Sequence, residues 1–187
     1  EGYDPAEFEG CCTAGGKPMD PAYMIKYGRL PNGKYMINWP THGNDYYANV
    51  VEMPYEERIE ALKPAREKTL RFIYHLQHEL GFRNLGIADD EFDTEDGLAY
   101  LPYHREGVVR LTLDDVTDRY DRPAALYRTG ISVGDYPVDH HHACYPGFGK
   151  IDFPPVPSFS VPLGALIPAG TDNLVVSDKA ISVSNLI

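Results

Sequence analysis

The chain has 187 residues, of which 43% are hydrophobic and 24% are charged. This composition is typical of a globular protein that is long enough to bury a core without disulfide bonds. Its formal net charge of −11 argues against a nucleic-acid partner, because phosphate binding depends on clustered Lys and Arg side chains. The sequence contains no apolar run that approaches the roughly 20 residues of a membrane-spanning helix, so we expect no membrane-spanning segment.

The three cysteines, Cys11, Cys12 and Cys144, do not form a recognisable framework. Their number is odd, adjacent cysteines rarely pair with each other, and no C-x-x-C spacing indicates a zinc site. We therefore expect neither a disulfide scaffold nor a structural zinc ion.

The beginning of the chain is rich in Gly and Pro. We expect an irregular N-terminal segment over residues 1–33, followed by one domain over residues 34–187. The chain opens at Glu1 without the pattern of a signal peptide and stops at Ile187 after an apolar stretch. Both ends are typical of an internal segment, so we expect the chain to be the middle portion of a longer protein.

One segment has a strong helical pattern. Apolar residues recur at helical spacing between Ile59 and Leu80, with charged residues between them. We predict a helix over residues 55–80 that bends near Lys63, since Pro64 lacks an amide hydrogen and clashes with the preceding turn.

Short runs of strand composition make up much of the rest of the chain. They predict strands at residues 34–39, 108–113, 126–133, 159–161 and 173–177. The expected fold class is α+β, with a mainly antiparallel sheet covered by one long kinked helix.

Two glycine-containing patterns lack the context that their chemistry requires. Gly147-Phe148-Gly149 is followed by Asp152 where a dinucleotide-binding turn needs its third glycine, and no helix pattern comes after it. The residues 130–134 (GISVG) fit the G-x-S-x-G pattern of a hydrolase nucleophile elbow, but a helix-breaking Pro137 follows. We expect an ordinary strand with flanking glycines at residues 130–134.

The densest group of chemically versatile side chains is Asp139-His140-His141-His142. On a strand, His140 and His142 would share one face and His141 the other. Two imidazoles and a carboxylate suit zinc or iron, whereas a single imidazole suits a general base near a substrate hydroxyl. A structural hydrogen-bonded cluster is the third alternative.

Two other segments combine groups that suit a ligand. Tyr103-His104-Arg105-Glu106 places an imidazole, a cation and a carboxylate before a predicted strand, which indicates either a ligand site or a surface ion pair. Residues 39–47 contain Trp39, Asp45 and Tyr46, which suit a sugar or another polyhydroxylated ligand. The alternative for residues 39–47, a loop anchored to the core by its aromatic rings, is slightly favoured.

Several segments, taken in order, resemble the FAD-dependent oxidoreductase family in which some members carry the label xanthan lyase. The matching segments are GRLPNGKYMINWPTHGNDYY (28–47), ELGFRNLGIADDEF (79–92), LPYHRE (101–106), LYRTGISVGDYPVDHHHA (126–143), VPLGALIP (161–168) and NLVVSDKAISVSNLI (173–187). The segment 126–143 is the most specific of them. In relatives the HRE segment continues through a Ser-Arg-Arg-like stretch, whereas here Gly107 follows Glu106 directly.

The resemblance implies the substrate domain of a glutathione-reductase-like flavoprotein, in which sequence on both sides of this domain builds the FAD-binding part. It implies FAD as the cofactor of the parent protein, not retained by this fragment. It also implies that the remainder of the parent flavoprotein is a partner. By resemblance, Ser182, Ser184 and Asn185 approach the flavin.

We therefore expect the parent protein to transfer electrons to FAD from a small-molecule substrate, with a sugar as the first candidate. His141 or His142 is the expected catalytic proton acceptor. The expected substrate-binding residues are Asp45, Tyr46, His104, Arg105, Asp139 and His140. The fragment alone should be inactive, and the alternative function is a non-catalytic module that binds a glycan or a protein.

Overall fold

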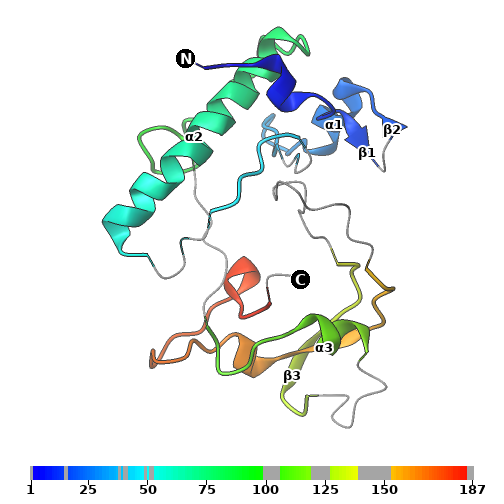
Figure 1. Cartoon of the computed structure of the whole chain (residues 1–187), viewed down its shortest axis with the longest axis vertical. Helices are drawn as coiled ribbons and strands as arrows, with labels where there is room; N and C mark the ends of the chain where they lie inside the picture. The colour runs from blue at the N-terminus through cyan, green and yellow to red at the C-terminus, as the bar shows by residue number, and fades with distance from the viewer. Residues whose placement is uncertain are drawn as a thin grey trace. The chain divides into compact units, whose positions relative to one another are not determined.

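The computed structural model describes residues 2–14, 17–37, 39, 42–48, 50, 53–98, 106–118, 127–138 and 153–184. These residues form two compact units, one up to residue 98 and the other from residue 106 onward. Each unit contains helix and a short antiparallel pair of strands, so the predicted α+β class is confirmed (Figure 1).

Two short helical elements occur where the sequence predicted irregular structure over residues 1–33. The 3-10 helix η1 (Pro5–Phe8) and the helix α1 (Pro21–Tyr27) both begin with the sequence Asp-Pro-Ala. The carboxylates of Asp4 and Asp20 each accept a hydrogen bond of 2.9 Å from the amide two residues later. The capping carboxylate satisfies a free amide and the proline fixes φ, and together these two effects start each helix.

The N-terminal unit also contains a small ribbon between η1 and α1. Strands β1 (Thr13–Ala14) and β2 (Lys17–Pro18) pair antiparallel. The segment that was expected to be irregular is therefore part of the folded N-terminal unit, together with the long helix that follows it.

The long predicted helix is confirmed as α2 (Tyr55–His78), which runs through Pro64 as one element (Figure 1). After its end, Gly81 has a φ of +82°, the left-handed conformation that glycine adopts without steric cost. The amide of Phe82 then donates to the carbonyl of Leu76 at 2.9 Å and directs the chain back along the helix.

The buried face of α2 closes an aromatic core. Phe72 and Leu76 pack with Phe8, Ile25 and Trp39, all of which are 5% exposed or less. The ring centroids of Phe8 and Phe72 are 5.1 Å apart, and Trp39 meets Phe72 edge-on at 5.5 Å. Within its own unit, α2 packs on η1, and Ile25 of α1 joins the same core.

Ion pairs join segments of the N-terminal unit that are distant in sequence. Arg71 of α2 donates from Nε and Nη2 to the two carboxylate oxygens of Glu7, both at 2.7 Å. Arg66 donates from Nε to Asp96 at 2.7 Å. These contacts attach the N-terminal segment and the loop after α2 to the same helix.

The C-terminal unit is built around one antiparallel pair of strands. Strand β3 (Gly130–Gly134) pairs with β4 (Phe159–Pro162), with a shift of register between Gly130 and Ser132. The predicted strand at residues 159–161 is confirmed. The strand predicted at residues 126–133 begins only at Gly130 among the described residues.

Three other predicted strands are absent from the described residues. Residues 34–37 and 39, 108–113 and 173–177 contain at most an isolated bridge, such as the one between Leu111 and Val183. The prediction was wrong because strand-like composition reflects a half-buried surface and does not by itself supply a pairing partner.

Helix α3 (Leu113–Thr117) was not predicted. It begins with a capping box, in which the amide and hydroxyl of Thr112 both donate to the carboxylate of Asp115 at 2.8 and 2.7 Å. The helix forms where the sequence analysis extended a strand to Leu113.

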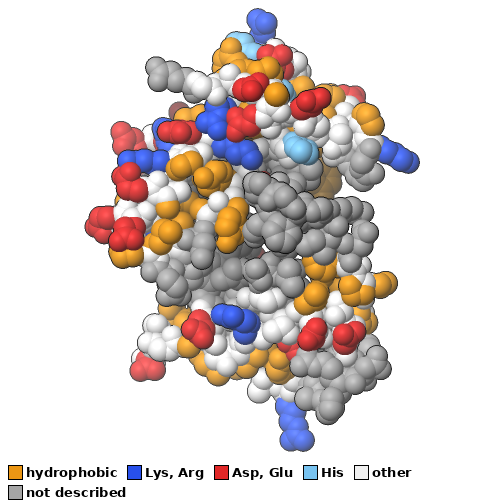
Figure 2. Space-filling view, in the orientation of Figure 1, with side chains coloured by type: hydrophobic (Ala, Val, Ile, Leu, Met, Phe, Trp, Pro, Cys, Tyr) orange, Lys and Arg blue, Asp and Glu red, His pale blue; other side chains and the backbone are white. Residues whose placement is uncertain are grey.

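Within the described part of the chain, every helix is too short or too polar to span a bilayer. Figure 2 shows acidic and basic side chains interspersed over the visible face rather than gathered by sign. This distribution agrees with the spread of acidic residues along the sequence.

Candidate functional site

The C-terminal unit holds the segment 181–184 between two other segments. The Leu111 amide donates to the Ser182 carbonyl at 3.0 Å, and the Ser184 amide donates to the Leu111 carbonyl at 2.8 Å. On the other side, the Ser182 amide donates to the Ala165 carbonyl at 2.8 Å. These three bonds fix the backbone of the segment, and therefore also the directions of its side chains.

The hydroxyl oxygens of Ser182 and Ser184 are buried and have no hydrogen-bond partner in the described part of the chain. Ser182 as a whole is 1% exposed. Because side chains alternate along an extended segment, residues two apart lie on the same side of it. A buried hydroxyl without a partner costs about 1–3 kcal/mol, so both groups call for a partner beyond the described residues.

A glycine allows the close packing beneath Ser182. A Cβ atom added to Gly107 would lie 2.7 Å from the Ser182 Cβ and 3.0 Å from the Gly164 carbonyl oxygen. A Cβ atom on Gly164 would lie 2.6 Å from a methyl carbon of Val109. The sequence analysis noted Gly107 only as a departure from the family pattern, since a single glycine after Glu106 does not reveal what approaches it.

Asp45 and Tyr46, two predicted substrate-binding residues, belong to the N-terminal unit. Lys68 Nζ donates to the Asp45 backbone carbonyl at 2.6 Å, and the Tyr46 side chain is 42% exposed. Trp39 is only 4% exposed and packs on Phe72. For Trp39, the anchored-loop alternative is therefore correct, and its ring is not available to a sugar.

The segment 130–134 is an ordinary strand, as expected. Ser132 lies exposed on β3, and residues 135–138 after it are not helical. A Cβ atom on Gly134 would lie 2.6 Å from the Phe159 ring on β4, which explains the glycine by packing. The arrangement lacks the helix that raises a nucleophilic serine in a hydrolase.

The remaining predicted site residues lie outside the described residues. They are the catalytic candidates His141 and His142, the substrate-binding candidates His104, Arg105, Asp139 and His140, and the cofactor-binding candidate Asn185. Their roles stay predictions. Among the residues that the structure does describe, no group of three His, Cys, Asp or Glu side chains is arranged to hold a metal ion.

A protein-family comparison identifies the class to which this chain belongs. A family model described as FAD dependent oxidoreductase matches residues 1–187. The chain therefore belongs to the FAD dependent oxidoreductase family, as predicted, and this membership implies oxidoreductase activity with FAD as the cofactor. Comparisons with curated proteins and with solved structures gave no match.

The two buried hydroxyls fit the needs of such a cofactor. A hydroxyl donates one hydrogen bond and accepts two, and FAD presents carbonyl oxygens, ring nitrogens, hydroxyls and phosphates that complement both roles. Ser182 and Ser184 are also two of the three residues that the sequence resemblance places near the flavin. That role stays a prediction, with which hydroxyls that lack a partner among the described residues are compatible.

Proposed function

We propose that this chain is the substrate-side portion of an FAD-dependent oxidoreductase of the glutathione-reductase-like kind. In this proposal other sequence supplies most of the flavin pocket, and the portion by itself is inactive. The observation that carries the proposal is the pair of buried, unpartnered hydroxyls of Ser182 and Ser184. The family match over residues 1–187 supports it. The label xanthan lyase in the resembling family makes a carbohydrate-related compound the first substrate to try.

When bound, FAD supplies the hydride-accepting chemistry. The part of this chain is to hold the substrate and to move a proton. His141 or His142 takes the proton from the substrate, and Ser182 and Ser184 form hydrogen bonds that orient the cofactor. The predicted substrate-binding residues hold the substrate, namely Asp45, Tyr46, His104, Arg105, Asp139 and His140.

The first test is an absorbance spectrum of the full-length protein purified from its host. We expect two flavin bands, in the near ultraviolet and the blue, which candidate sugars bleach without air. His141→Ala or His142→Ala should keep the bands and slow the bleaching by about 10²–10⁴-fold. A colourless protein that does not take up added FAD would contradict the flavoenzyme assignment, and bleaching at the normal rate in both variants would contradict the proton acceptor.

The second test uses Ser182→Ala, which should weaken FAD retention in the full-length protein but stabilise this chain alone. In the full-length protein, loss of one hydrogen bond of about 0.5–1.5 kcal/mol should weaken FAD retention by about 2–10-fold. In this chain alone, the substitution removes an unpartnered hydroxyl and should raise the melting temperature. Ser177→Ala, which removes an exposed hydroxyl, is the control and should change neither quantity. The variant could instead retain FAD normally and have a lower melting temperature. That result would show that the partner of the Ser182 hydroxyl is a group of the protein and not FAD.

A further inference from the structure

Two adjacent thiols, an imidazole and a phenol form a chain of contacts in the N-terminal unit. The sulfur atoms of Cys11 and Cys12 are 3.8 Å apart. Cys11 Sγ lies 3.7 Å from His75 Nε2, and the Tyr3 hydroxyl lies 2.8 Å from His75 Nδ1. The cluster thus joins the segment after η1 to the last turns of α2.

The two thiols differ in access. Cys11 is 4% exposed and His75 is 7% exposed, whereas Cys12 is half-buried. The backbone holds both residues in place, since the Cys11 amide donates to the Phe8 carbonyl at 3.0 Å and the Met19 amide donates to the Cys12 carbonyl at 2.8 Å. The Cys12 thiol is therefore accessible from solvent, whereas the Cys11 thiol is buried.

We propose that Cys11 and Cys12 are a redox-active vicinal dithiol, in which Cys12 reacts first with small disulfides and Cys11 then closes an internal disulfide. His75 accepts the Cys11 proton in the closing step, and Tyr3 positions the imidazole. This proposal does not depend on the function proposed for the C-terminal unit.

The reaction balances with one small disulfide, such as oxidised glutathione, as the oxidant. The Cys12 thiolate attacks one sulfur of the oxidant, the oxidant's sulfur–sulfur bond breaks, and one glutathione thiolate leaves. Cys11 transfers its proton to His75 Nε2 and attacks Cys12 Sγ, which breaks the mixed disulfide and releases the second glutathione. Two thiols become one disulfide, and one oxidised glutathione becomes two reduced molecules.

The product disulfide should be easy to reduce. Adjacent Cα atoms are about 3.8 Å apart, which is less than the separation that an unstrained disulfide spans. Strained disulfides have higher reduction potentials and are the labile ones. The pair is therefore a reversible modification site, which is compatible with the absence of a disulfide scaffold in the sequence pattern.

The electrostatics of the cluster set the pH dependence of the reaction. Burial raises the pKa of Cys11 to about 12, and burial also raises the pKa of Cys12, to which the Asp20 carboxylate adds. Burial lowers the pKa of His75, against the opposing effect of Glu79, which favours the neutral imidazole. For Tyr3, burial raises the pKa, and Glu79, Tyr74 and Asp4 raise it further.

Because the thiolate is the nucleophile, the oxidation rate should rise about tenfold per pH unit above neutrality.

The test treats the full chain carrying Cys144→Ser with oxidised glutathione, blocks free thiols by alkylation, and weighs the tryptic peptides. Pro18 prevents cleavage after Lys17, so both thiols lie in one peptide that ends at Lys26. We expect this peptide to lose the two thiol hydrogens, to keep no glutathione, and to recover both thiols on mild reduction. A folded chain in which neither thiol reacts, or in which glutathione stays on Cys12, would overturn the proposal.

Single substitutions assign the two roles. Cys11→Ser should accumulate glutathione on Cys12, and Cys12→Ser should leave Cys11 unmodified while the chain is folded. Tyr3→Phe keeps the ring contacts and should slow only the closing step. An unchanged closing rate would remove the positioning role of Tyr3. Fluorescence of the buried Trp39 monitors folding, and if Cys11→Ser does not fold, the peptide mass of the parent chain decides the question.

Discussion

Two sets of buried polar groups, one in each unit of this chain, have different surroundings. In the N-terminal unit, the buried imidazole of His75 has Tyr3 at one nitrogen and Cys11 at the other. In the C-terminal unit, the buried hydroxyls of Ser182 and Ser184 have no hydrogen-bond partner among the described residues. Since native proteins rarely leave buried polar groups without partners, these two hydroxyls are the basis of the function proposed above.

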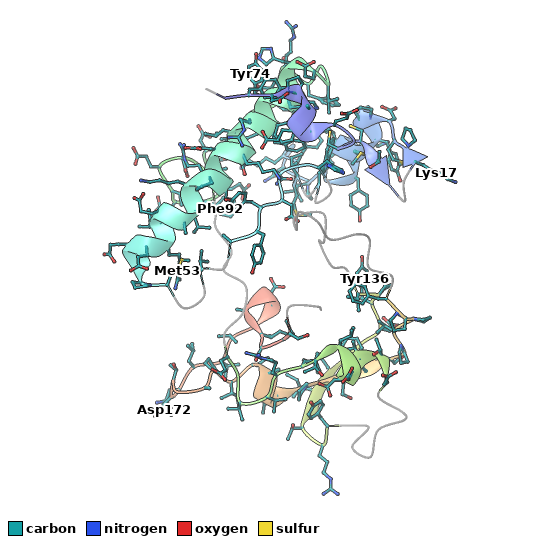
Figure 3. The ribbon with its side chains drawn as sticks, in the orientation of Figure 1. Lys17, Met53, Tyr74, Phe92, Tyr136 and Asp172 are labelled. Atoms are coloured by element: carbon teal, nitrogen blue, oxygen red, sulfur yellow. The ribbon has the colours of Figure 1, made fainter. Side chains whose placement is uncertain are left out.

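The two units also differ in their cores, while both expose large apolar side chains. A long helix and an aromatic cluster around Phe72 form the core of the N-terminal unit, whereas Tyr27 and Tyr55 of the same unit are 85% and 69% exposed. In the C-terminal unit, Ile131 and Val133 on β3 are 53% and 74% exposed. Tyr136, which follows the strand and is labelled in Figure 3, is 72% exposed. Both units therefore expose large apolar side chains, and the N-terminal unit differs in its aromatic core around Phe72.

The largest expected effect comes from a substitution in the core of the N-terminal unit. Phe72→Ala should destabilise the N-terminal unit by about 3–5 kcal/mol, because it removes a buried ring and leaves a cavity. Trp39 is the only tryptophan of the chain and packs on Phe72, so its fluorescence in a urea titration reports this unit. Phe92→Ala, at a ring that is 51% exposed, is the control and should cost less than about 0.5 kcal/mol. Equal losses in both variants would show that Phe72 is not central to the core.

A smaller effect is expected in the C-terminal unit. Gly107→Ala should cost about 1–3 kcal/mol, because its Cβ would lie 2.7 Å from the Ser182 Cβ. Faster hydrogen exchange at the Leu111 and Ser182 amides would show the effect. Gly86→Ala is the control, since it has no atom within 4 Å of its new Cβ, and it should be neutral or slightly stabilising. Unchanged exchange in Gly107→Ala would mean that the packing around Ser182 yields without cost.

The smallest effect concerns an ion pair and depends on pH. The hydrogen bond from Arg66, followed by that from the Leu98 amide, lowers the pKa of Asp96 below its ordinary value. The pair therefore stabilises the fold above the ordinary carboxyl pKa, and this contribution disappears as the pH falls through the lowered value. Arg66 is 42% exposed, so solvent screening limits the contribution to about 0.2–1 kcal/mol.

Urea titrations of Arg66→Gln and of the parent chain measure this contribution. The difference between their unfolding free energies should be present at about pH 6 and smaller at about pH 3. Lys63→Gln, which breaks the exposed pair with Glu60 on the same helix, should change stability little at either pH. A difference for Arg66→Gln that grows as the pH falls would contradict the assigned sign.

The sequence predicted secondary structure correctly where the pattern extended over a long segment. The apolar spacing before Leu80 predicts α2, because helical periodicity over more than 20 residues is a property of the segment itself. Short helix signals were missed, whereas the short strand at residues 159–161 was predicted. The Asp-Pro-Ala starts of η1 and α1 and the capping box at Thr112 are visible in the sequence, but the helices that they begin are too short to show periodicity.

By itself, the sequence determined the α+β class, the long helix, the strand at residues 159–161 and membership in the FAD dependent oxidoreductase family. Only the tertiary structure decided that Trp39 is buried, that Ser182 packs over Gly107 with its hydroxyl unpartnered, and that Cys11 meets His75. The physical reason is that the residues in contact are far apart in the sequence. Local patterns specify how a segment prefers to fold, whereas burial and close contact depend on which distant segment packs against it.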